Sequence, residues 1–135
     1  MKTQPVEGKI IIPAGLNIWP HELETAKALA NFGHMVEFKK KTEGYKVHSA
    51  DVYMDGKFWE FKSPKSEKLD AIERNLRRAK TQSERIVLDS ARMKKIPDTA
   101  IKREILAKAP YITEIKEVIF INRKRECIDI YRKKH

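Results

Sequence analysis

Apolar residues recur at two different spacings along this chain, and each spacing predicts a type of secondary structure. Helical spacing in three segments predicts helices from Pro20 to Gly33, over about fifteen residues capped by Ser66, and after Pro97. Short runs rich in β-branched and aromatic residues predict strands. These runs are Ile10–Ile12 as an edge strand, His34–Lys41, Arg85–Asp89, and two C-terminal strands, IKEVIFIN and ECIDIY, around a basic turn at Arg123–Arg125.

A hairpin is predicted in the middle of the chain, where Asp55-Gly56 separates DVYM from KFWEF. Asp-Gly between apolar-rich runs is a strong signal for a two-residue turn. Such a turn pairs Val52 with Trp59 and places Asp51 opposite Glu60. Val52 and Trp59 then face the core.

The order of the predicted elements is typical of an α/β domain with a mixed β-sheet flanked by helices. We expect one domain over residues 1–135, with its core at about 17–90, because no repeat or long linker divides the chain. Trp19 and Trp59 are expected in the core.

Composition narrows the functional classes. Hydrophobic residues make up 41% of the chain, which is too many for a disordered protein, and no apolar run reaches the ~20 residues of a membrane span. The 29 basic and 19 acidic residues give a net charge of +10, which favours a polyanionic partner such as nucleic acid. The single cysteine, Cys127, excludes a disulfide framework and is expected to lie buried or half-buried in a strand.

The predicted hairpin brings two carboxylates together. Period-two alternation also places Lys62 on the same face as Glu60. Because opposed carboxylates repel each other, a shared proton, a nearby cation or a metal ion must offset the cost. Hard divalent ions bind carboxylate oxygens and act on phosphate substrates, and a nearby lysine can stabilise developing phosphate charge. Asp51, Glu60 and Lys62 together therefore indicate a phosphodiesterase site.

The sequence EFK occurs twice, and the two copies differ. Glu37 has no aspartate upstream of it, so Glu37 and Lys39 are interpreted as an exposed strand end. A third metal ligand is expected from the first helix, where Glu22 shares a face with the apolar stripe and Glu24 points into solvent. The alternative for Glu22 is that it stabilises the helix N-terminus electrostatically.

Glu22, Asp51, Glu60 and Lys62, carried on a helix followed by a hairpin, resemble the PD-(D/E)xK nuclease superfamily; Ala50 replaces the usual proline before the aspartate. The run HELETAKALANFGHMVEF, with HSADVYMDGKFWEFKSP and LDAIERNLRRAKTQSERIVLD, resembles the C-terminal tRNase domain of contact-dependent growth inhibition toxins. The resemblance implies a metal-dependent tRNA nuclease with Mg²⁺ favoured and Mn²⁺ or Zn²⁺ as alternatives. It also implies a bacterial delivery protein at the cell surface or secreted, action in the cytoplasm of the target cell, and a cognate immunity protein.

The second predicted helix carries a further set of polar residues. Its cations are candidates for contacts with a phosphate backbone, or they form a solvated helix face: Arg74, Arg77, Arg78 and Lys80. Asn75 and Gln82 lie on nearly one face of this helix and could support the site or bond locally.

Two other functions stay open at this point. A DNA endonuclease of the same superfamily would use the same metal chemistry on a different phosphodiester. A non-catalytic nucleic-acid-binding module would use Asp51, Glu60 and Lys62 as a structural ion cluster.

Overall fold

The structure is a computed structural model that describes residues 8–40 and 51–134. The elements that it forms are, in chain order, β1 (Lys9–Ile11), α1 (Pro20–Asn31), β2 (Met35–Phe38), β3 (Val52–Met54), β4 (Lys57–Lys62), α2 (Ala71–Ala79), β5 (Arg85–Asp89), α3 (Asp98–Lys108), a 3₁₀ turn η1 (Ala109–Tyr111), β6 (Glu117–Ile121) and β7 (Cys127–Arg132). Lys41 and Ala50 lie outside the described residues.

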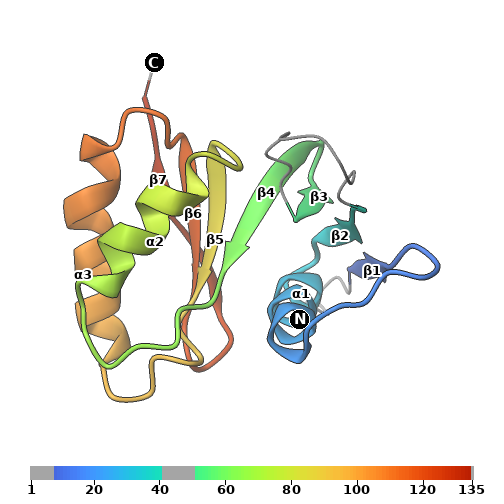
Figure 1. Ribbon diagram of the computed structural model, residues 1–135, viewed down its shortest axis with the longest axis horizontal. Helices are drawn as coiled ribbons and strands as arrows, with labels where there is room; N and C mark the ends of the chain where they lie inside the picture. Colours follow the sequence, from blue (N-terminus) through green and yellow to red (C-terminus); the bar gives the residue numbers. More distant parts are fainter. Residues whose placement is uncertain (1–7, 41–50, 135) are drawn as a thin grey trace, which may run out of the picture.

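The strands form one mixed sheet in the order β1-β2-β3-β4-β5-β6-β7 (Figure 1). β4, β5 and β6 are parallel to one another, and β1 is parallel to β2; the other neighbouring pairs are antiparallel. The predicted mixed α/β architecture is therefore confirmed, with seven strands and three α-helices in the part of the chain that the structure describes.

Each face of the sheet buries its own apolar cluster. On one face α1 contributes Ala26 and Leu29 to a cluster with Val52, Trp59 and Phe61. On the other face the buried residues of α2 and α3 pack against β5 and β6: Ile72, Leu76, Ile101, Ile105, Ile86, Leu88, Val118 and Phe120. Burial of apolar surface on both faces holds the helices against the sheet.

The central hairpin forms as predicted. Asp55 and Gly56 both have positive φ, 54° and 78°, as a type I′ turn requires. The register pairs Val52 with Trp59, and Tyr53 stacks edge-on against Phe58 with 5.0 Å between ring centroids. The hairpin therefore fixes which side chains of β4 share a face.

Two sequence-based expectations were wrong. The second helix is shorter than predicted, because it begins at Ala71 rather than near Ser66. The Ser66 hydroxyl instead accepts the backbone N–H of Lys68 at 3.0 Å, which forms a local turn. Trp19 is 69% exposed instead of buried, because it precedes α1 outside the apolar cluster. Trp59 is buried, as predicted.

Within residues 8–40 and 51–134, no helix has the length and apolar content that a membrane span requires.

Candidate active site

Glu60 and Lys62 lie on one face of β4, as the alternation predicted. Their register partners on β5 are Ile86 and Leu88, so both side chains belong to the face that α2 and α3 cover. Lys62 Nζ lies 3.5 Å from Glu60 Oε2. The Glu60 side chain is 5% exposed and that of Lys62 is 24% exposed. This pair therefore joins a buried carboxylate to an ammonium group that solvent can reach.

Asp51 directly precedes β3, and its carboxylate is held by the next strand. Asp51 Oδ2 accepts the backbone N–H of Phe61 at 3.1 Å. Phe61 stands between Glu60 and Lys62, so this bond fixes the Asp51 carboxylate at the segment that carries the Glu-x-Lys pair. The ladder itself begins one residue later, at Val52. The Asp51 carboxylate is thus held beside the Glu60–Lys62 segment by its bond to the Phe61 N–H, and not by a ladder pair with Glu60.

Glu22 has a structural role that the sequence had left as an alternative. Its Oε1 accepts the backbone N–H of Trp19 at 3.1 Å, which satisfies one of the unpaired donors at the start of α1. Glu22 also lines a pocket of about 600 Å³ together with Asp51 and the chain from Gly15 to Trp19. Glu24 is exposed, as predicted, and it pairs with Lys27.

The described residues contain no group of three or more His, Cys, Asp or Glu side chains arranged to hold a metal ion. Glu22, Asp51 and Glu60 are therefore not assembled into one ligand set. Asp51 and Glu60 have the hard oxygen donors that suit Mg²⁺, which commonly binds through one or two protein carboxylates and keeps several waters. The two carboxylates fit a divalent ion of this kind.

The other EFK copy differs in its surroundings. Glu37 and Lys39 form an ion pair of 3.1 Å in which both side chains are well exposed, 37% and 39%. Exposed pairs of this kind contribute little to stability and are screened by salt. Glu37 and Lys39 thus match Glu60 and Lys62 in sequence but not in burial.

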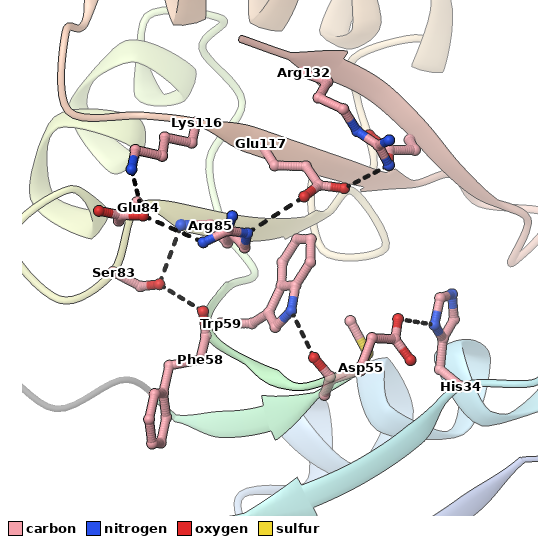
Figure 2. Close-up of polar contacts among 12 residues, drawn as sticks. His34, Asp55, Phe58, Trp59, Ser83, Glu84, Arg85, Lys116, Glu117 and Arg132 are labelled. Carbon is pink, nitrogen blue, oxygen red and sulfur yellow. Dashed lines mark hydrogen bonds and ion pairs between the residues drawn. The ribbon is translucent and has the colours of Figure 1, made fainter. Parts of the chain in front are cut away.

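A second buried carboxylate, Glu117, pairs with Arg85 at the start of β5, whereas Lys62 pairs with Leu88 near its end. Figure 2 shows Glu117 between Arg85 and Arg132. Glu117 Oε2 accepts Arg132 Nη2 at 3.1 Å, and Glu117 Oε1 lies 3.4 Å from Arg85 Nε. Burial raises the pKa of the Glu117 carboxyl above its ordinary value, and the neighbouring Asp129 raises it further. Arg132 lowers this pKa, but burial and Asp129 outweigh its effect.

A third buried carboxylate, Asp89, ends β5 and is 1% exposed. Arg125 donates to both of its oxygens, at 2.7 and 2.8 Å, and the Thr25 hydroxyl donates to Oδ2 at 2.6 Å. No role was predicted for Asp89 from the sequence. The one available signal was an acidic residue at the end of an apolar strand. The residues near Asp89 in the sequence do not indicate its partners, because Thr25 and Arg125 lie 64 and 36 residues away in the chain.

Three of the four cations predicted to bind nucleic acid are paired with carboxylates. Arg74 contacts Asp70 at 2.9 Å, Arg77 contacts Glu73 at 2.9 Å, and Lys80 contacts Glu114 at 3.3 Å. Arg78 is exposed. The exposed face of α2 is thus close to neutral where these pairs form.

The two residues proposed as site support make local contacts. Asn75 Nδ2 donates to the Ala71 carbonyl at 2.8 Å, one turn earlier in α2. Gln82 follows the helix, and its backbone N–H donates to the Ala79 carbonyl at 2.9 Å. Neither contact involves Lys62.

Comparisons with known proteins agree with this fold. A family model for the contact-dependent growth inhibition CdiA C-terminal domain matches residues 48–127, more than half of the chain. Among solved structures, the chain is similar to the CdiA-CT/CdiI toxin and immunity complex from Burkholderia pseudomallei, with a TM-score of 0.69 and 20% identity over 92% of this chain and 99% of that one. At this identity the similarity shows a shared fold. No curated protein sequence matches the chain significantly.

Proposed function

This chain belongs to the family of CdiA C-terminal domains of contact-dependent growth inhibition, and we propose that it is a toxin domain that cleaves tRNA as a metal-dependent endoribonuclease. The observation that carries the proposal is the buried Glu60, 3.5 Å from Lys62, beside an Asp51 carboxylate bound to Phe61. This arrangement supports a site of the PD-(D/E)xK type.

Each of these side chains has a role in the proposed reaction. Lys62 donates to a non-bridging phosphate oxygen and stabilises the negative charge that develops there in the transition state. Its ion pair with Glu60, 3.5 Å away, limits the position of the ammonium group. The bond from Phe61 N–H holds the Asp51 carboxylate in place before substrate binds, which avoids an ordering cost during the reaction.

A divalent ion, with Mg²⁺ favoured over Mn²⁺ and Zn²⁺, would be held by Asp51 and Glu60 and would supply charge neutralisation at the phosphate and activation of water. Glu22 lines the pocket that Asp51 shares. Because Glu22, Asp51 and Glu60 are not assembled into one ligand set in the described residues, Glu22 would have to move from its contact with Trp19 to serve as a third ligand.

We also propose a cognate immunity protein as partner, because the similar Burkholderia protein was solved as a toxin and immunity complex. The domain would be carried by a bacterial delivery protein at the cell surface or secreted, and it would act in the cytoplasm of the target cell. An equimolar amount of the immunity protein should suppress cleavage of tRNA.

The test compares wild-type protein with Asp51→Ala, Glu60→Gln and Lys62→Met on total tRNA with Mg²⁺. Each substitution should lower the cleavage rate by at least about a hundredfold, the size typical for loss of a group that stabilises transition-state charge. Chelation should stop the wild-type enzyme, and separate additions of Mg²⁺, Mn²⁺ and Zn²⁺ should identify the ion that restores it.

The second EFK copy provides a matched control. Glu37→Gln changes the same residue type as Glu60→Gln in an exposed pair, and this variant should cleave at the wild-type rate. Plasmid DNA is offered in parallel with RNA. Undiminished cleavage by Asp51→Ala or Glu60→Gln would refute the site, and preferential cleavage of DNA would refute the substrate class.

A further inference from the structure

A second pocket of about 600 Å³ lies between the segments that follow β4 and β5, and cationic side chains dominate its lining. The residues that line it are Lys65, Ser66, Glu67, Arg92, Lys94 and Lys95. We propose that this pocket binds the phosphodiester backbone of the RNA substrate and holds it beside Lys62. This inference rests on the proposed function and assigns substrate binding to a surface other than α2.

The position of the pocket, at the ends of two neighbouring strands, supports this proposal. β4 and β5 are parallel, and Lys62, the last residue of β4, pairs with Leu88 near the end of β5. The segments that continue from the two strands leave the sheet at the same end, toward the bottom of Figure 1. In parallel sheets, ligands bind at this carboxyl end.

The pocket also lies on the face of the sheet that α2 and α3 cover. Leu69, from the segment after β4, packs against the same apolar cluster as Met93 and Ile96, from the segment after β5. That cluster covers the face to which Glu60 and Lys62 also belong. The pocket and the Glu60–Lys62 pair are therefore at one end and on one face of the sheet.

The charge of the lining also favours a phosphate. Among the described residues, four cations and one carboxylate line the pocket, and the only ion pair within this set joins Lys95 to Glu67 at 3.4 Å. Both side chains of that pair are at least 70% exposed, so solvent screens it and a phosphate can replace it at small cost. Within the described residues, no ion pair involves Lys65, Arg92 or Lys94. Arg74, Arg77 and Lys80, by contrast, are each paired with a carboxylate, so the negative charge of these partners reduces the attraction of that surface for phosphate.

The lining also indicates what the pocket recognises. None of the described residues that line it has an aromatic side chain on which a base could stack. Contacts from lysine and arginine to phosphate fix the position of a nucleic acid but carry no sequence information. The pocket therefore takes the sugar–phosphate backbone of any tRNA, and loss of its charges should weaken binding of different tRNAs equally.

The experiment measures binding of purified tRNA to the Glu60→Gln protein, which separates binding from cleavage, and repeats the measurement on wild-type protein in chelator. The pocket variant combines Lys65→Gln, Arg92→Gln and Lys94→Gln. The matched control combines Arg74→Gln and Arg77→Gln on α2 with Lys80→Gln at its C-cap and removes the same number of charges. Thermal unfolding confirms that each variant is folded.

We expect the pocket variant to bind tRNA at least about tenfold more weakly and to lower the slope of log affinity against log salt by about 2 to 3, since each phosphate contact contributes about 0.7 to 0.9. The α2 variant should bind within about threefold of its parent. A variant that combines Lys65→Arg, Arg92→Lys and Lys94→Arg keeps the three positive charges. It should bind tRNA with the affinity and the salt slope of its parent.

Equal losses in the pocket and α2 variants, or an unchanged salt slope in the pocket variant, would overturn the inference. Unchanged tRNA affinity with loss of immunity-protein binding would also overturn it and would assign the pocket to a protein partner. Failure of the proposed function is distinguishable: wild-type protein would then bind tRNA through the pocket without cleaving it.

Discussion

Arg125 and Asp89 form a two-pronged ion pair across the fold, with Nη1 2.7 Å from Oδ1 and Nη2 2.8 Å from Oδ2. Arg125 also donates to the Glu24 carbonyl at 3.1 Å, and Thr25 donates to Asp89. The pair therefore connects the turn before β7 to the end of β5 and to α1. Because Glu22 lies on α1, this contact sets where the helix and its carboxylate sit against the sheet.

Removing the guanidinium should destabilise the protein strongly. Arg125→Ala leaves the buried Asp89 carboxylate without its cation, and loss of one partner of a buried pair costs about 3 to 5 kcal/mol. Arg125→Lys should cost less but still lower stability, because an ammonium group cannot bind both oxygens in the same geometry. Urea unfolding monitored by circular dichroism measures the free energy of unfolding.

The matched control for Arg125→Ala is Arg74→Ala, which removes an arginine from a pair whose two side chains are more than half exposed. Its effect should stay below about 1 kcal/mol. Similar losses in the two variants would mean that the Asp89–Arg125 pair does not hold the elements together.

Two substitutions of Glu22 separate its capping role from its proposed role as a metal ligand. Glu22→Gln retains an oxygen that can accept the Trp19 N–H, so stability should change little, while Glu22→Ala should lose about 1 kcal/mol with the cap. Both variants should lose RNA cleavage. Glu24→Gln, at the exposed Glu24–Lys27 pair, should preserve stability and cleavage. Full cleavage by Glu22→Gln would restrict Glu22 to capping.

The Glu117 carboxyl should make a measurable contribution to the pH dependence of stability. Its pKa in the folded protein is raised above the ordinary 4.5, chiefly by burial and then by Asp129. The folded state thus binds a proton more tightly than the unfolded state, and the contribution of Glu117 is lost as pH rises from below 4.5 through the folded pKa.

The measurement is the difference in unfolding free energy between wild type and Glu117→Gln at a series of pH values. The stability of wild type relative to the variant should fall as pH rises through this window. Glu24→Gln, which removes an exposed carboxyl, is the control and should show no comparable fall. A difference that rises with pH would contradict the raised pKa of Glu117.

Cys127 should be a poor nucleophile in the folded protein. Burial in β7 raises the pKa of its thiol to about 12, although the positive charge of Arg125 opposes the shift. Since only the thiolate reacts, alkylation by iodoacetamide at pH 8 should be slower in the native than in the unfolded protein by a factor on the order of 10² to 10³.

The chain has one cysteine, so mass spectrometry of the labelled protein reports this thiol alone. The native alkylation rate should keep rising above pH 9 without a plateau. Equal rates for native and unfolded protein would contradict the burial of Cys127.

Elements with local signals were predictable from the sequence. Pro20 marked the start of α1, and Asp55-Gly56 marked the hairpin, because a helix N-terminus and a two-residue turn depend on the backbone preferences of a few neighbouring residues. The start of α2 was missed because Ser66 has the chemistry of a helix cap but forms a turn with Lys68 instead. Propensity alone does not distinguish the two.

In the candidate site, too, some features were predictable from the sequence and others were not. Strand alternation was enough to place Glu60 and Lys62 on one face. It could not reveal that Asp51 binds the backbone of Phe61, because this contact depends on where the β3–β4 ladder ends. For Glu22 the sequence offered both a metal-binding and a helix-terminal role, and the structure shows its contact with the Trp19 N–H. Counting charges could not show that Arg74, Arg77 and Lys80 are paired with carboxylates. Nor could it show that, among the described cations that line the cationic pocket, only Lys95 forms an ion pair.

The sequence by itself determined the mixed α/β class, the hairpin register and the face shared by Glu60 and Lys62, since each follows from residues close together in the chain. Only the tertiary structure decided that β5 lies beside β4 and that Arg125 reaches Asp89, 36 residues away. The physical reason is that ion pairs and pockets form between segments brought together by burial of apolar faces, and the energy of each charge depends on the neighbours that this packing supplies.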